Sequence, residues 1–183
     1  MAAVAFDNRR ASPGSWPAWP LDALLWTLFL GPLLAPLLRA TGLPLLADAG
    51  ALARELLATY VCPTPERSLL LFGLPMAVCA RCWGATLGLG AARLLVGWVA
   101  GGVGRRQSRL AQALGWFRGL PLPARLLLCG LPFLLWPLEI AGQGNGWWHA
   151  PLWLLLLNGA QAGLAAGLLC CSLWPGMWPR RAG

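Results

Sequence analysis

Four long apolar runs dominate the chain, and polar, proline-rich or glycine-rich segments separate them. A helix needs roughly 20 apolar residues to cross about 30 Å of bilayer hydrocarbon, and the runs approach or exceed this length. We therefore predict an all-α integral membrane protein with four transmembrane helices within residues 21–174. A lead of residues 1–20 and a tail of residues 175–183 flank this membrane domain. The predicted spans are residues 21–38, 83–99, 122–138 and 150–174.

Residues 43–60 have a different pattern, with apolar side chains at three- and four-residue steps and charged residues such as Asp48 and Arg54 between them. This spacing predicts an amphipathic helix that lies in the membrane interface rather than across the bilayer. Residues 61–82, which contain prolines, a glycine and three cysteines, are predicted to form an exterior loop. Residues 101–119 are predicted to form the most basic loop of the chain.

The amino-acid composition also indicates a membrane protein. Of the 183 residues, 58% are hydrophobic and 11% are charged, whereas about a quarter of the residues in a soluble protein are charged. A soluble fold of this length would need more polar side chains to cover its surface. The net charge of +8 is compatible with nucleic-acid binding, but most arginines lie beside apolar segments, where the positive-inside rule accounts for them. We therefore expect the lipid bilayer, and not nucleic acid, as a partner.

The distribution of arginines predicts the orientation of the spans. With four spans, both termini and the loop of residues 101–119 lie on one side of the membrane. Cytoplasmic segments carry an excess of arginine and lysine, so the side that is richer in arginine is predicted to be cytoplasmic. The other side holds only Arg39, Arg54, Arg67 and Arg81. The arginines on the terminal side are Arg9, Arg10, Arg105, Arg106, Arg109, Arg118, Arg180 and Arg181. Both termini are therefore predicted to be cytoplasmic.

Small residues recur at four-residue steps in the second and fourth spans. Such stripes let two helix backbones approach closely in lipid, where no hydrophobic effect drives helices together. Two amide side chains lie in the fourth span and are expected to face protein, because an unpaired polar group in lipid is costly. The predicted packing residues are Gly84, Gly88, Gly159, Gly163 and Gly167, together with the amides Asn158 and Gln161.

Three cysteines and two arginines form the densest motif of the chain. Cys62 begins the run Cys-Pro-Thr-Pro-Glu-Arg-Ser, and Cys79 begins the run Cys-Ala-Arg-Cys-Trp-Gly. In these residues the chain resembles an uncharacterised family of bacterial and archaeal membrane proteins, domain of unknown function 2085. That family typically shows Cys-His-Gln, then Pro-x-Arg-Ser, then Cys-x-Arg-Cys-x-Gly at the start of a helix. The matching residues are Cys62, Pro65, Arg67, Ser68, Cys79, Arg81, Cys82 and Gly84.

The resemblance extends over about residues 20–170 and implies a multi-pass protein of a prokaryotic cell membrane. The family has no established activity, so the resemblance implies an architecture rather than a reaction. The chain also departs from the family pattern. Pro63 replaces the usual His, Ala141 stands where an Asp often precedes glycine, and Gln161 replaces an Arg of the last span. An activity that needs those groups is not expected here.

The cysteines of this motif can be interpreted in several ways. Thiolates at Cys-x-x-Cys spacing can hold zinc or another thiophilic metal, and a structural zinc site takes four Cys or His ligands. Cys62, Cys79 and Cys82 supply three ligands, and His149, which is predicted on the same face, can supply the fourth. A disulfide or reduced packing thiols are alternatives, because the exterior is an oxidising compartment. Catalytic thiol exchange, and a haem or pigment held by His149 as axial ligand, are further alternatives.

Arg67 and Arg81 flank the cysteines and can anchor their loop. Paired guanidinium groups can bind phosphate or carboxylate groups, but a salt bridge or a contact with lipid headgroups is the simpler interpretation, and Glu139 can accept one of these arginines. The sequence has no Ser-His-Asp arrangement, phosphate-binding glycine loop or carboxylate pair suited to acid–base catalysis. We therefore expect a non-catalytic accessory or structural subunit that packs against other membrane-protein subunits.

Overall fold

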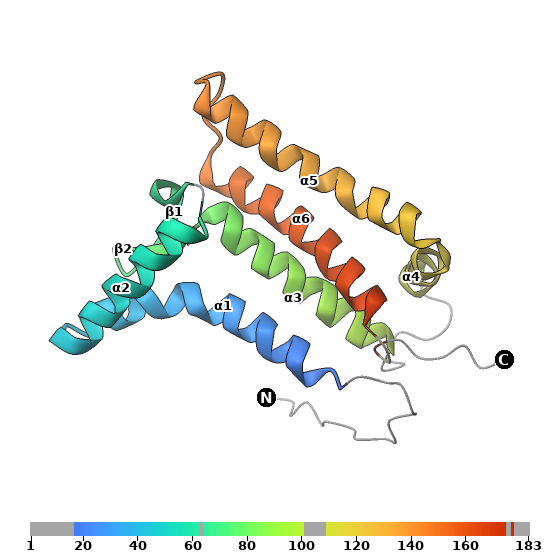
Figure 1. Cartoon of the computed structure of the whole chain (residues 1–183), viewed down its shortest axis with the longest axis horizontal. Helices are drawn as coiled ribbons and strands as arrows, with labels where there is room; N and C mark the ends of the chain where they lie inside the picture. The colour runs from blue at the N-terminus through green and yellow to red at the C-terminus, as the bar shows by residue number, and fades with distance from the viewer. Residues whose placement is uncertain (1–16, 63, 101–108, 175–176, 178–183) are drawn as a thin grey trace.

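The computed structural model describes residues 17–62, 64–100, 109–174 and 177, which form a helical bundle with a small β-hairpin at one end (Figure 1). Four of its helices are long enough and apolar enough to cross a membrane. The prediction of an all-α membrane protein with four spans is therefore confirmed, although the first three spans are longer than expected and the fourth is slightly shorter. The four helices are α1 (Trp19–Ala40), α3 (Ala80–Ala100), α5 (Leu122–Gly144) and α6 (Leu152–Leu173).

The four long helices lie side by side in the order α1, α3, α6, α5 (Figure 1). The most extensive contact is between α3 and α6, while α5 packs on the other side of α6 and α1 on the other side of α3. The start of α1, the end of α3, the start of α5 and the end of α6 lie at one end of the bundle. The hairpin and the α5–α6 connection lie at the opposite end, which we call the hairpin end.

Helix α2 (Pro44–Tyr60) closely matches the predicted amphipathic helix of residues 43–60. Pro44 stands in its first turn, where the missing N–H of proline costs nothing. The helix folds back against α1 and leaves the bundle at an angle (Figure 1). Gly50 makes the closest approach, because a Cβ atom there would lie 2.6 Å from the carbonyl oxygen of Ala35. The end of α2 is thereby directed toward the hairpin.

The prediction of a loop for residues 61–82 was wrong for most of that segment. After a single 3-10 turn (Pro65–Arg67), β1 (Ser68–Leu71) and β2 (Leu74–Cys79) form an antiparallel hairpin. Its two-residue turn has positive φ at both Phe72 (54°) and Gly73 (76°), as a tight type I′ hairpin turn requires. Helix α3 then begins directly at Ala80, three residues before the predicted start of the second span.

A second correction concerns the basic segment of residues 101–119. Its second part is the helix α4 (Arg109–Gly119), while residues 101–108 lie outside the described part of the chain. Leu114 and Phe117 are buried although arginines flank the helix, and Leu114 belongs to a cluster with Leu21, Val96 and Cys171. Burial of one apolar face stabilises this helix. From its composition alone, the segment resembles a solvated loop.

Candidate thiolate site and polar pocket

Three cysteine thiols converge at the hairpin end, each from a different element. Cys62 follows α2, Cys79 is the last residue of β2, and Cys82 lies in the first turn of α3. All three Sγ atoms lie within 4.8 Å of one another. The hairpin makes this possible, because its return strand brings Cys79 back beside the end of α2. Cys62 and Cys79 are 6% and 0% exposed, so the group is largely shielded from solvent.

Two hydrogen bonds link the three cysteines. The backbone N–H of Cys79 donates to Sγ of Cys62 at 3.1 Å, and the Sγ atoms of Cys79 and Cys82 are 3.5 Å apart. Contact with the thiols of Cys62 and Cys82 holds the pKa of Cys79 well below its ordinary value. The same contact with Cys79, followed by burial, raises the pKa of Cys62. The cluster therefore stabilises the thiolate form of Cys79. The thiolate is the form of sulfur that binds metals.

None of the six cysteines, all of which lie in the described part of the chain, forms a disulfide in this structure. We call the group of Cys62, Cys79 and Cys82 the thiolate site. Leu57, Val78 and Trp83 pack around this site, so the surroundings of its sulfur atoms are mostly apolar. Cys129 lies on α5, and Cys170 and Cys171 lie on α6. Among the described residues the only group of three or more cysteine, histidine or acidic side chains with converging ligand atoms is Cys62, Cys79 and Cys82.

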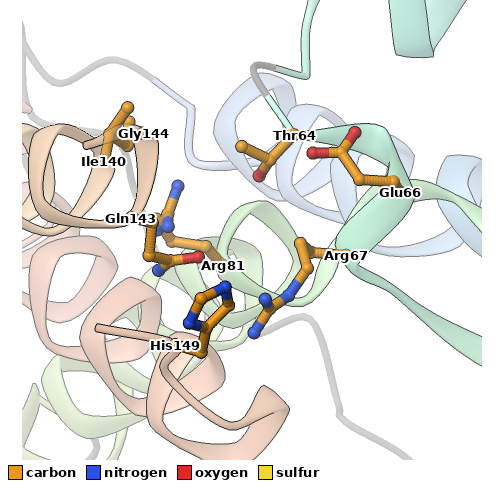
Figure 2. Close-up of a pocket in the computed structure, with 8 residues that line it drawn as sticks. All are labelled: Thr64, Glu66, Arg67, Arg81, Ile140, Gln143, Gly144 and His149. Carbon is orange, nitrogen blue, oxygen red and sulfur yellow. The ribbon is translucent and has the colours of Figure 1, made fainter. Parts of the chain in front are cut away.

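His149 does not join the cysteines. It lies exposed in the connection between α5 and α6, at the predicted end of the bundle, but it lines a separate pocket of about 310 Å³. The structure thus brings together three of the four predicted ligands and places the fourth elsewhere. We call this cavity the polar pocket, and Figure 2 shows its walls. Its lining residues are Thr64, Glu66, Arg67, Arg81, Ile140, Gln143, Gly144 and His149.

Both predicted anchoring arginines reach the polar pocket. Arg67 donates from Nη2 to the carbonyl oxygen of Ala150 and so ties the hairpin to the start of α6. Arg81 is 1% exposed and binds both carboxylate oxygens of Glu139, from Nε at 3.1 Å and from Nη2 at 2.9 Å. Its guanidinium carbon also lies 5.9 Å from the ring centre of Trp136, within cation–π range. The carboxylate suggested by the sequence therefore pairs with Arg81, not with Arg67.

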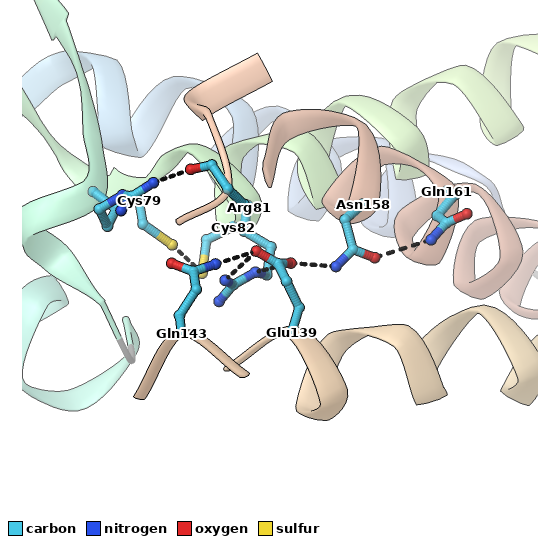
Figure 3. Close-up of polar contacts among 9 residues, drawn as sticks. Cys79, Arg81, Cys82, Glu139, Gln143, Asn158 and Gln161 are labelled. Carbon is cyan, nitrogen blue, oxygen red and sulfur yellow. Dashed lines mark hydrogen bonds and ion pairs between the residues drawn. The ribbon is translucent and has the colours of Figure 1, made fainter. Parts of the chain in front are cut away.

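A chain of polar side chains leads from the polar pocket into the bundle (Figure 3). Glu139 accepts hydrogen bonds from Gln143, at 2.5 Å, and from Asn158. Gln161 in turn donates to the side-chain oxygen of Asn158 at 2.9 Å. Glu139 and Asn158 are buried, at 8% and 7% exposure. Asn158 faces protein as predicted, whereas Gln161 is exposed on the outside of α6.

A family model described as "Predicted membrane protein (DUF2085)" matches residues 62–169, which is more than half of the chain. The chain belongs to this family. No curated protein and no solved structure matches it. The matched segment begins at Cys62 and contains the complete thiolate site, the polar pocket and the polar chain. The DUF2085 segment therefore contains every candidate site residue that the sequence suggested.

The glycine stripes of the DUF2085 segment form the contact between α3 and α6. A Cβ atom at Gly84 or Gly88 would overlap the backbone of α6, and one at Gly159 or Gly163 would overlap the backbone of α3. A Cβ atom at Gly167 would lie 2.6 Å from that of Ala92. The two helices therefore approach at backbone-to-backbone distance, which holds the first turn of α3, with Arg81 and Cys82, against the start of α6.

One ion pair outside the predicted site was missed. Arg93 of α3 binds both carboxylate oxygens of Asp22 of α1, at 2.6 and 3.0 Å. The pair lies toward the end of the bundle opposite the hairpin, and about a quarter of each side chain is exposed. A signal was present in the sequence, because an arginine and an aspartate inside two apolar spans need each other as partners.

Proposed function

We propose that this protein is a non-catalytic membrane protein in which Cys62, Cys79 and Cys82 bind one thiophilic metal ion, Zn²⁺ or Cu⁺. The observation that carries the proposal is the convergence of three sulfur atoms within 4.8 Å. Thiolate ligands favour these two ions over ions that prefer oxygen ligands, such as Mg²⁺ and Ca²⁺.

The spacing of the sulfur atoms supports the proposal. Zinc–sulfur bonds of about 2.3 Å in a tetrahedral site place two sulfur ligands roughly 3.8 Å apart. The Cys79–Cys82 separation of 3.5 Å is close to that value, and the other two separations do not exceed 4.8 Å. Three thiolates can satisfy Cu⁺, whereas Zn²⁺ would take a water molecule as its fourth ligand. The lowered pKa of Cys79 favours the deprotonated form of that ligand.

The burial of the ligands favours a structural rather than a catalytic role. Cys62 and Cys79 are almost fully covered by neighbouring side chains, so a substrate has little access to an ion between them. A bound ion would instead tie together the end of α2, the end of β2 and the first turn of α3. Because the hairpin has only two short strands, it gains from such a cross-link.

Elemental analysis of the detergent-purified protein tests the proposal. We expect one zinc or copper ion per chain, lost in Cys79→Ser and retained in Cys170→Ser, a matched variant of an exposed cysteine on α6. Intact mass under non-reducing conditions provides the complementary measurement. Protein without metal, or with a mass lower by two hydrogens because a disulfide has formed among the three cysteines, would contradict the proposal.

We also propose that both termini are cytoplasmic and that the hairpin end faces the exterior of a prokaryotic cell. Arg109 and Arg118 of α4 support this orientation, since α4 lies at the end of the bundle opposite the hairpin. The other six arginines used in the prediction, at positions 9, 10, 105, 106, 180 and 181, lie outside the described residues. Reporter fusions at each terminus test the proposal, and an exterior signal from either terminus would contradict it.

A role as a subunit of a larger membrane complex is a second candidate, and Gln161 favours it. Gln161 lies near the middle of α6 and is exposed on the outside of the isolated chain, although its amide nitrogen donates to Asn158. A polar group facing lipid at that depth is costly, and a polar side chain of a neighbouring helix would relieve the cost. We expect a stoichiometric complex in mild detergent that Gln161→Leu weakens and Leu127→Ala, at an exposed leucine of α5, does not. If the wild-type protein and both variants are monomers in mild detergent, this role is contradicted.

The alternative of a haem or pigment held by His149 is not proposed. The pocket that His149 lines has Glu66, Arg67 and Arg81 in its walls, whereas cofactor sites are lined mainly by apolar and aromatic side chains.

A further inference from the structure

The geometry points to a binding site for a phosphate group in the polar pocket, distinct from the thiolate site. The pocket has a volume of about 310 Å³ and lies at the hairpin end between the segment that precedes the hairpin, the start of α3, the end of α5 and the connection that precedes α6. Arginine side chains from two different elements line it. The proposal does not depend on metal binding, because none of the three cysteines lines this pocket.

The decisive observation is the Nη1 atom of Arg81. Arg81 is 99% buried, and Glu139 occupies only its Nε and Nη2 atoms. Nη1 is buried without a hydrogen-bond partner among the described residues. A buried guanidinium donor that is left unpaired costs free energy. An oxyanion in the pocket that Arg81 lines would provide the missing acceptor, and would do so without displacing Glu139.

Arg67 supplies the second positive group. Its Nη2 atom donates to the carbonyl oxygen of Ala150, which holds the side chain in place. No other hydrogen bond joins the Arg67 guanidinium to a described residue, so its remaining N–H groups can donate to a ligand. Figure 2 shows the Arg67 guanidinium and the His149 ring beside one another on one side of the pocket. Donors that approach from separate elements suit a tetrahedral anion, which accepts hydrogen bonds in several directions.

Two carboxylates limit the positive charge of this region. Glu139 pairs with Arg81 and neutralises its charge. The exposed Glu66 lines the pocket near Thr64 (Figure 2). The site is therefore weakly rather than strongly positive, and the geometry of the arginine donors has to supply the selectivity. The same chemistry is offered by free inorganic phosphate and by the headgroup of an anionic lipid, since this end of the bundle lies next to the membrane surface in a four-span arrangement.

Titration calorimetry with the full chain in detergent tests the proposal for inorganic phosphate. Native mass spectrometry after reconstitution in phosphatidylcholine vesicles, with and without phosphatidic acid, tests it for a lipid phosphate. Saturable binding of inorganic phosphate indicates the free anion, and retention of phosphatidic acid without that binding indicates the headgroup. Binding of neither probe would overturn the proposal.

Variants locate the binding. Arg67→Gln is expected to weaken it about 10-fold or more, because a charged hydrogen-bond donor is lost. Arg54→Gln, a matched change on α2 outside the pocket, is expected to leave it unchanged. Glu66→Gln, at an exposed position whose change should not disturb folding, is expected to tighten it roughly two- to fivefold by removing a like charge. Equal losses in Arg67→Gln and Arg54→Gln, or weaker binding in Glu66→Gln, would overturn the assignment. Metal content is measured in each variant and is expected to stay at the wild-type value.

Discussion

Arg81 on the first turn of α3 binds Glu139 of α5 through two hydrogen bonds, of 2.9 and 3.1 Å, although the two residues lie on helices that do not follow one another in the chain. The side chains are 1% and 10% exposed, so this ion pair is buried. It links the hairpin end of α3 to α5, and it fixes the orientation of Arg81 at the polar pocket.

Glu139→Gln is expected to destabilise the protein by about 3–5 kcal/mol, because the variant leaves the buried guanidinium of Arg81 without its counter-charge. Thermal unfolding in detergent measures the change. Glu55→Gln, at an exposed position on α2, serves as the control and should have little effect. The double variant Arg81→Met/Glu139→Leu should be more stable than Glu139→Gln alone, since it removes both charges. A Glu139→Gln protein as stable as the wild type would contradict the importance of the pair.

Gly88→Ala is expected to cost about 1–3 kcal/mol, because the added methyl group would overlap the backbone carbonyl of Ala160 and force α3 and α6 apart. The matched control is Gly90→Ala on the same helix, where a Cβ atom has no neighbour within 4 Å. That change should be neutral or stabilising by up to about 1 kcal/mol. Unfolding midpoints of the two variants in one detergent provide the comparison, and equal midpoints would mean that the glycine contact is not close.

Asp22→Asn is expected to loosen α1, because the Arg93 guanidinium loses its counter-charge and one of its two acceptor oxygens. The loss should be about 1–3 kcal/mol, the usual range for a hydrogen bond to a charged group. Hydrogen exchange followed by mass spectrometry should show faster exchange in α1 and unchanged exchange in α6. Asp48→Asn, at an exposed position on α2, is the control. Faster exchange in both variants would show that the effect is not specific to the pair.

The four spans could be predicted from the sequence because a long apolar run has few structural alternatives in lipid. The hairpin could not, since β1 has the continuous apolar run Leu69–Leu71 without strand alternation, and Phe72 is an unfavourable residue for positive φ. The helix α4 was missed because its charges concealed the spacing of Leu114 and Phe117. Both elements are stabilised by tertiary packing, which the local sequence pattern does not reveal.

The candidate site was only partly predictable for a similar reason. The sequence placed Cys79 and Cys82 together because Cys-x-x-Cys is a common spacing of metal ligands. Cys62 joins them only through the hairpin, which the sequence pattern did not reveal. His149 was assigned to the correct end of the bundle, but topology alone could not show that it lines the polar pocket instead of approaching the sulfur atoms.

Metal removal should destabilise the hairpin end in particular. A ligand at 100 times its dissociation constant stabilises a fold by about 2.7 kcal/mol, and a chelator should remove stabilisation of that order. Hydrogen exchange in β1 and β2 should accelerate after chelation, while exchange in the α3–α6 contact should change little. Re-addition of the metal should restore the slow exchange. Identical exchange with and without the chelator would show that no ion supports this end of the molecule.

X-ray absorption spectroscopy at the metal edge tests the central claim most directly. We predict three sulfur ligands per ion, at about 2.3 Å if the ion is zinc, and a loss of sulfur coordination in Cys82→Ser. The Cys170→Ser protein should give the wild-type spectrum. A metal bound mainly by oxygen or nitrogen ligands, or a spectrum unchanged in Cys82→Ser, would contradict the thiolate site.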